Sequence, residues 1–127
     1  MILNDPAALA SLTAACDVYE NALMTNALET LDALFWDDPH TLRYGVAENL
    51  YGIDEIRAFR LARPGGSPQR QVLRREIVTF GADIGLCNLE FQRIGGTKIG
   101  RQSQTWMRTS DGWRVVSAHV SLMQDMS

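Results

Sequence analysis

The sequence predicts an α+β fold, in which three helices pack on one face of a strongly curved, mainly antiparallel sheet. Up to about residue 69 most apolar residues recur at helical spacing, whereas from residue 70 onwards apolar and polar residues alternate with a period of two. Tight turns separate the later strands, and strands joined by such turns run antiparallel. The expected order is helix, helix, strand, strand, helix and then four strands. A long helix across a bent sheet makes a cone, whose open end is the default ligand site.

The first two helices are predicted from their start signals and from their apolar spacing. Asp5 followed by Pro6 indicates a helix start, because a capping carboxylate precedes proline at the first helical position. Asn26 with Glu29 resembles a capping box and predicts a second, short helix, which ends at residues 37–39. The apolar face of the first helix has spacings of 3, 4, 3 and 4 and consists of Leu9, Leu12, Cys16, Tyr19 and Leu23.

The rest of the chain divides into strands, one further helix and a loop. Short strands are expected over residues 40–46 and 48–51, a third helix over 53–63, and a loop rich in glycine and proline over 64–68. Gly-containing turns then separate four long strands, which are expected over residues 71–80, 84–94, 98–108 and 113–123.

Length and composition set the class of protein. The 127 residues, 46% hydrophobic and 21% charged, are typical of a single globular domain, expected over residues 1–127. The net charge of −3 argues against a nucleic-acid partner. No apolar run approaches the roughly 18 residues of a membrane span, and the N-terminal residues lack the regions of a signal peptide. We therefore expect a cytoplasmic protein with no membrane or nucleic-acid partner.

The charges are unevenly distributed along the chain. Residues 1–42 contain seven acidic residues and no basic one, and arginine accounts for 11 of the 12 basic residues that follow. An acidic helical layer that meets an arginine-rich sheet explains most of this pattern. The alternative for one or two arginines is the binding of a small anion, because the guanidinium fork matches carboxylates and phosphates.

Tyr19 and Arg43 are the strongest catalytic candidates. Tyr19 lies in the middle of the apolar face of the first helix, and a buried phenol needs a hydrogen-bond partner. If the strand face that carries Arg43 lines the cavity, a buried guanidinium lies beside this phenol and requires a carboxylate side chain or an anionic ligand. Two alternatives stay open: a core tyrosine bonded to a backbone carbonyl, and an ion pair of Arg43 with Glu48 or Asp38 at the rim.

Gln104 and His119, on the last two long strands, are candidates for substrate binding, in addition to Arg43. Strand alternation places Gln104 on one face with Gln102 and Trp106, but the pattern does not tell which face lines the cavity. His119 has the same ambiguity. These two residues are therefore assigned to the cavity as expectations from chemistry rather than from orientation.

No metal or other cofactor is expected. His40 lies near two aspartates, but this cluster before a proline is typical of capping and turn chemistry. Cys16 and Cys87 lack the spacing of metal ligands. They are expected to be two buried thiols, with a disulfide as the alternative.

Two long stretches and a shorter one resemble the AtzH-like family, over about residues 10–124. That family belongs to the nuclear-transport-factor-2-like (NTF2-like, SnoaL-like, cystatin-like) superfamily. The resemblance therefore implies an NTF2-like cone and a homodimer formed through the sheet. The stretches are VYENAL around Tyr19, FWDDPHTLRYGVAENLYGIDEIRAFRLAR, and IGRQSQTWMRTSDGWRVVSAHVSLM.

The resemblance also implies a function. It points to a cofactor-independent, decarboxylating amidohydrolase, a hydrolase of C–N bonds that acts on a small N-carboxylated urea such as 1,3-dicarboxyurea. The setting would be catabolism of s-triazine, purine or oxalurate nitrogen, with an amidase-signature hydrolase as a partner. The family's catalytic tyrosine and arginine match Tyr19 and Arg43, of which Arg43 would hold the substrate carboxylate and Tyr19 would transfer a proton.

Two further functions are compatible with the sequence. The first is a non-catalytic dimeric module that binds a small carboxylate or accompanies the amidase, because a fold does not determine a function. The second is a steroid-isomerase-like acid–base enzyme, which would need an aspartate in the cavity. The strand acids Glu76 and Glu90 fit that role poorly by position.

Overall fold

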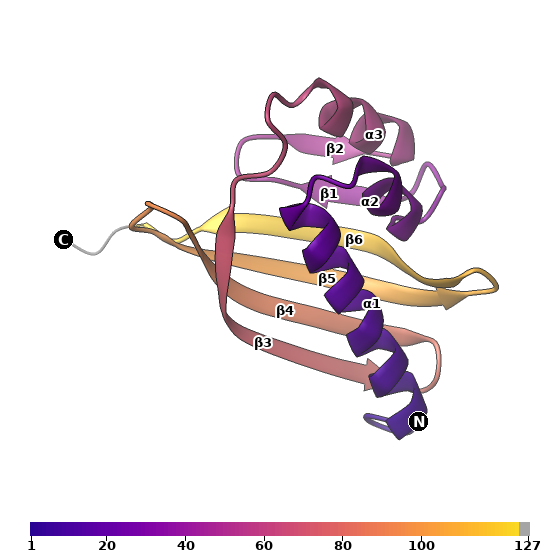
Figure 1. Cartoon of the computed structure of the whole chain (residues 1–127). Helices are drawn as coiled ribbons and strands as arrows, with labels where there is room; N and C mark the ends of the chain where they lie inside the picture. Colours follow the sequence, from indigo (N-terminus) through magenta and orange to yellow (C-terminus); the bar gives the residue numbers. More distant parts are fainter. Residues whose placement is uncertain (125–127) are drawn as a thin grey trace.

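The computed structural model describes residues 1–124, which form three helices on one side of a six-stranded sheet (Figure 1). The order of elements confirms the predicted α+β class. The helices are α1 (Pro6–Met24), α2 (Leu28–Leu34) and α3 (Ile53–Ala62). The strands are β1 (Leu42–Tyr44), β2 (Asn49–Tyr51), β3 (Arg70–Phe80), β4 (Ile84–Arg93), β5 (Ile99–Thr109) and β6 (Gly112–Leu122).

The sheet has the strand order β2-β1-β6-β5-β4-β3. Strands β3 to β6 form an antiparallel meander, and β2 is antiparallel to β1. The exception is β1, which pairs in parallel with β6 and places Arg43 opposite Ala118. The β5–β6 register shifts between Thr105 and Trp106, and such irregularities increase the local twist of a sheet. The segment that carries Arg43 is thus joined to the meander through its last strand.

Helix α1 crosses the sheet and supplies most of the helical side of the core (Figure 1). Leu12, Cys16 and Tyr19 of the predicted apolar face are buried, whereas Leu9 is only half-buried. Against them lies Trp106 of β5, which is 0% exposed. Its ring meets the Tyr19 ring edge-on, with 6.4 Å between centroids. Aromatic pairs of this geometry fix ring positions as well as bury area.

The start of α1 is capped as predicted, and the start of α2 is not. The Ala8 backbone N–H donates to Asp5 Oδ2 at 3.1 Å. Asn26, in contrast, does not cap α2, because the helix starts after Ala27 without any side-chain cap. Asn26 has a φ of 54°, and the Ala27 N–H donates to the Ala22 carbonyl at 2.9 Å. This is the left-handed geometry that closes a helix C-terminus, so Asn26 ends α1 instead.

We expect Asp5→Ala to lower the free energy of unfolding by about 0.5–2 kcal/mol, because the Ala8 N–H then loses its acceptor. Urea denaturation measures the change. Asp5→Asn is the matched control, since its amide oxygen still caps the helix and only the charge is lost. An equal loss in both variants would contradict a capping role.

The two short strands are shorter than predicted because turns take up their ends. The Asp38 carboxylate accepts the His40 backbone N–H at 2.8 Å, and the Thr41 N–H reaches the Asp38 carbonyl. The bond from the His40 N–H holds the pKa of Asp38 below its usual value. The predicted turn chemistry of this segment is therefore present. Within residues 1–124, no helix combines the length and apolarity needed to cross a bilayer.

Candidate functional site

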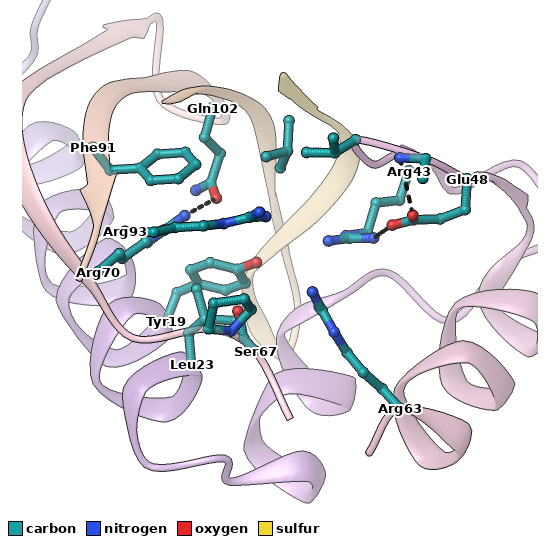
Figure 2. Close-up of a pocket in the computed structure, with 14 residues that line it drawn as sticks. Tyr19, Leu23, Arg43, Glu48, Arg63, Ser67, Arg70, Phe91, Arg93 and Gln102 are labelled. Carbon is teal, nitrogen blue, oxygen red and sulfur yellow. Dashed lines mark hydrogen bonds and ion pairs between the residues drawn. The ribbon is translucent and has the colours of Figure 1, made fainter. Parts of the chain in front are cut away.

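A cavity of about 230 Å³ opens between α1, β1, the end of α3 and the neighbouring ends of β3, β4 and β5 (Figure 2). This volume lies below the roughly 300–1,000 Å³ typical of sites for drug-sized ligands, so it suits a small molecule. The lining is strongly cationic. Its charged residues are Arg43, Arg63, Arg70, Arg93 and Glu48.

Tyr19 reaches this cavity from α1 and is 5% exposed. Its ring lies 6.2 Å from the Phe35 ring in addition to its contact with Trp106. Packing on two sides therefore fixes the ring, and the hydroxyl points into the cavity (Figure 2). Among residues 1–124 no side chain or backbone carbonyl forms a hydrogen bond with that hydroxyl. The alternative of a core tyrosine bonded to a carbonyl is thus not what the structure shows.

Arg43 lines the same cavity from the middle of β1. Its side chain is 13% exposed, and Nη1 donates to Glu48 Oε1 at 3.0 Å. The ion pair with Glu48, considered above as an alternative, is therefore present together with the cavity position. A guanidinium has five N–H donors, so this pair leaves donors for a ligand.

The place of Glu48 depends on a glycine. Glu48 Oε2 accepts the Ala47 N–H at 3.2 Å, and the carboxylate lies so close to Gly45 that a Cβ there would overlap it. The turn between β1 and β2 thus holds the counter-charge of Arg43 in a defined position.

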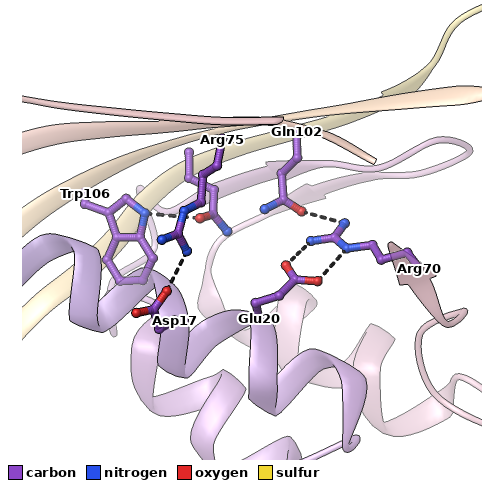
Figure 3. A network of polar contacts seen from close by, with 7 residues as sticks. Asp17, Glu20, Arg70, Arg75, Gln102 and Trp106 are labelled. Atoms are coloured by element: carbon purple, nitrogen blue, oxygen red, sulfur yellow. Dashed lines mark hydrogen bonds and ion pairs between the residues drawn. The ribbon is translucent and has the colours of Figure 1, made fainter. Parts of the chain in front are cut away.

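Arg70 closes the wall of the cavity on the side of β3, and the sequence analysis did not single it out. It is bonded to Glu20 through two nitrogens, Nε to Oε2 at 3.0 Å and Nη2 to Oε1 at 2.7 Å (Figure 3). Its Nη1 donates to Gln102 Oε1 at 3.1 Å, and its guanidinium lies 4.5 Å from the centre of the Phe91 ring. Arg70 therefore joins α1, β3, β4 and β5 at the cavity.

The sequence did not predict Arg63 and Arg93 as site residues either. They differ from Arg43 and Arg70 in their partners. Both line the cavity, but among residues 1–124 neither has a carboxylate within ion-pair distance. Burial, followed by the nearby charges of Arg43 and Arg93, lowers the pKa of Arg63. Four guanidinium groups therefore line one small space, and two of them have no carboxylate partner within residues 1–124.

Gln104 and His119 do not line this cavity. The residue of β5 that does is Gln102. Gln104, two positions further on, is 2% exposed and accepts the Trp106 Nε1–H at 3.1 Å. His119 points to the face without helices, is exposed, and contacts the Tyr44 ring at 5.6 Å between centroids. The lining of this cavity therefore gives no support to their expected role in substrate binding.

The two cysteines are free and buried, as expected. A hydrogen bond between the thiols, together with burial, raises the pKa of Cys16, while the same bond lowers the pKa of Cys87. Over residues 1–124 there is no group of three or more His, Cys, Asp or Glu side chains that could hold a metal ion.

Comparison with known proteins gives the family. The AtzH-like family model matches residues 1–126. This chain belongs to the AtzH-like family. A DUF3225-family protein of unknown function from Pectobacterium atrosepticum is 53% identical, with a TM-score of 0.93 over 96% of this chain and 95% of that one. A cystatin-like fold protein from Burkholderia xenovorans is 42% identical, with a TM-score of 0.94 over 99% of both chains.

More distant likeness confirms the fold of this AtzH-like protein. An NTF2-like protein of unknown function from Pseudomonas putida shares 15% identity, with a TM-score of 0.79 over 95% of this chain and 90% of that one. At this identity the likeness shows the NTF2-like fold alone. None of the curated proteins matches the chain.

Proposed function

We propose that this AtzH-like protein is a cofactor-independent, decarboxylating amidohydrolase for a small N-carboxylated urea such as 1,3-dicarboxyurea, in the catabolism of nitrogen compounds. One observation carries the proposal. Tyr19 and Arg43, from different elements, line the same small cavity, where the phenol has no hydrogen-bond partner within residues 1–124 and the guanidinium keeps free donors. A proton donor and an anion-binding group are thus available to one small ligand.

The proposed step needs only these two groups and solvent. The C–N bond to one carboxylate breaks, its electron pair stays on nitrogen, and the nitrogen takes a proton from the Tyr19 hydroxyl. The products are allophanate and carbon dioxide, and Tyr19 regains a proton from solvent. Arg43 binds the retained carboxylate and stabilises the negative charge that develops on the adjacent carbonyl oxygen.

Release of carbon dioxide from freshly generated 1,3-dicarboxyurea tests the proposal. The wild-type protein should release it well above the uncatalysed rate, and Arg43→Gln should lose the activity because the amide cannot bind the carboxylate as a charged fork. Binding of the compound without release of carbon dioxide would refute catalysis and identify the alternative, a non-catalytic module that binds small carboxylates. Co-purification with an amidase-signature hydrolase would support that partner in either case.

We also propose that two copies pair through the face of the sheet that the helices leave uncovered. Ser103 lies on that face in β5, between the inward-pointing Gln102 and Gln104, and it is opposite Asn88 of β4 and His119 of β6. This central position is where a second sheet would pack most closely.

Light scattering should therefore find a dimer of the wild type and a monomer of Ser103→Arg, because a large charge at the centre of the interface would be desolvated without a partner. Ala58→Arg adds the same charge at an exposed position of α3 and should stay dimeric. A monomeric wild type, or a dimeric Ser103→Arg, would rule out this interface.

A further inference from the structure

The four arginines of the cavity have only two carboxylate partners within residues 1–124. Arg43 pairs with Glu48 and Arg70 with Glu20, whereas Arg63 and Arg93 pair with none. Both unpaired side chains belong to half-buried residues. Partial burial of a cation without a counter-ion is unfavourable, so an anionic ligand would stabilise these two charges.

The two unpaired guanidinium groups approach the middle of the cavity from different elements. Arg63 is the C-cap residue of α3, and Arg93 is the last residue of β4. Their heads point toward the region that the Tyr19 hydroxyl and the Arg43 guanidinium also face (Figure 2). Burial lowers the pKa of Arg63 most, and the nearby positive charges of Arg43 and Arg93 lower it further, which agrees with this convergence.

A further donor lies in the wall of the cavity. Arg70 can only donate, so its partner on Gln102 is the amide oxygen, and the Gln102 amide nitrogen is left over. Gln102 is 3% exposed, and this nitrogen has no partner within the described chain. This nitrogen is shielded from the cavity as well as unpartnered, so the uncompensated charge of the wall comes from Arg63 and Arg93.

We propose that Arg63 and Arg93 form a second carboxylate subsite beside Arg43, so that the cavity selects small dicarboxylates over monocarboxylates. The inference rests on the proposed function and names the residues that recognise the second carboxylate of its substrate. With two free guanidinium groups, the site is neutralised by two negative charges on one short ligand. A monocarboxylate held by the free donors of Arg43 leaves the charges of Arg63 and Arg93 without an anion.

Isothermal titration calorimetry at pH 7.5 with malonate, acetate and inorganic phosphate tests the subsite without any turnover. We expect the wild type to bind malonate at least tenfold more tightly than acetate. Arg63→Gln and Arg93→Gln should each weaken malonate binding at least tenfold and acetate binding less than threefold. Arg57→Gln is the matched control, because it removes the same charge from α3 at a residue that pairs with Asp37 away from the cavity.

The outcomes separate the two proposals. Equal binding of malonate and acetate, or malonate selectivity that persists in both variants, would overturn the subsite even if carbon dioxide is released. Tighter binding of phosphate than of malonate would overturn the dicarboxylate assignment in favour of a general oxyanion site. Malonate selectivity that depends on Arg63 and Arg93 would support the subsite even if the protein has no turnover. If a glutamine variant does not fold, Arg63→Lys and Arg93→Lys take its place, since they keep the charge but not the fork.

Discussion

Tyr19→Phe should slow the release of carbon dioxide from 1,3-dicarboxyurea by roughly a hundred- to ten-thousand-fold, the usual contribution of a positioned proton donor. The change removes one oxygen atom that has no hydrogen-bond partner within residues 1–124. The ring keeps its contacts with Phe35 and Trp106. The loss should therefore appear in kcat, with the melting temperature and the affinity for malonate within error of the wild type.

Tyr44→Phe is the control for this experiment. Tyr44 lies on the opposite face of the sheet, where its hydrogen bond with Tyr51 raises the pKa of Tyr51. The same atom is removed there without any change to the cavity, so activity should be kept. A Tyr19→Phe protein with more than a tenth of wild-type activity would exclude Tyr19 as the proton donor.

Glu20→Gln should lower the free energy of unfolding by about 3–5 kcal/mol, the usual effect of removing one partner of a buried ion pair. The Arg70 side chain is 5% exposed and is held by Glu20 through two hydrogen bonds. An amide of the same shape cannot supply the negative charge that the guanidinium needs. The connection between α1 and β3 should weaken accordingly (Figure 3).

Urea denaturation of matched variants measures this effect. Glu76→Gln breaks an ion pair with Arg74 whose side chains are 67% and 66% exposed, and exposed pairs contribute little, so no measurable change is expected. Malonate should restore part of the stability of Glu20→Gln, because a ligand that binds only the folded state stabilises it. Equal losses in the two variants would show that the buried pair has no special role.

The fold could be predicted because local signals and hydrophobic periodicity agree over most of the chain. The Asp5 cap and the alternation in the four long strands are local features, and the structure has them where they were expected. The start of α2 was predicted wrongly because Asn26 also suits a left-handed helix end, which its side chain alone does not distinguish from a cap.

The site could be predicted only in part, because the cavity joins residues that are distant in sequence. Arg63 and Arg93 lie on different elements, and the only signal for them was the excess of arginine after residue 42. Alternation placed Gln102 and Gln104 on one face, but it does not tell which of them lies at the end of β5 that reaches the cavity. For His119 a signal existed: its neighbours Ala118 and Val120 are apolar and buried, which turns His119 outward.

The parallel pairing of β1 with β6 has a consequence for biosynthesis. The hairpins from β3 to β6 join neighbouring segments, whereas β1 must close a long loop to reach β6, and such closures are slow to form. Arg43 takes its place only after β6 has left the ribosome. A nascent chain that ends within β5 should therefore bury much of its helical face yet fail to retain a small dicarboxylate.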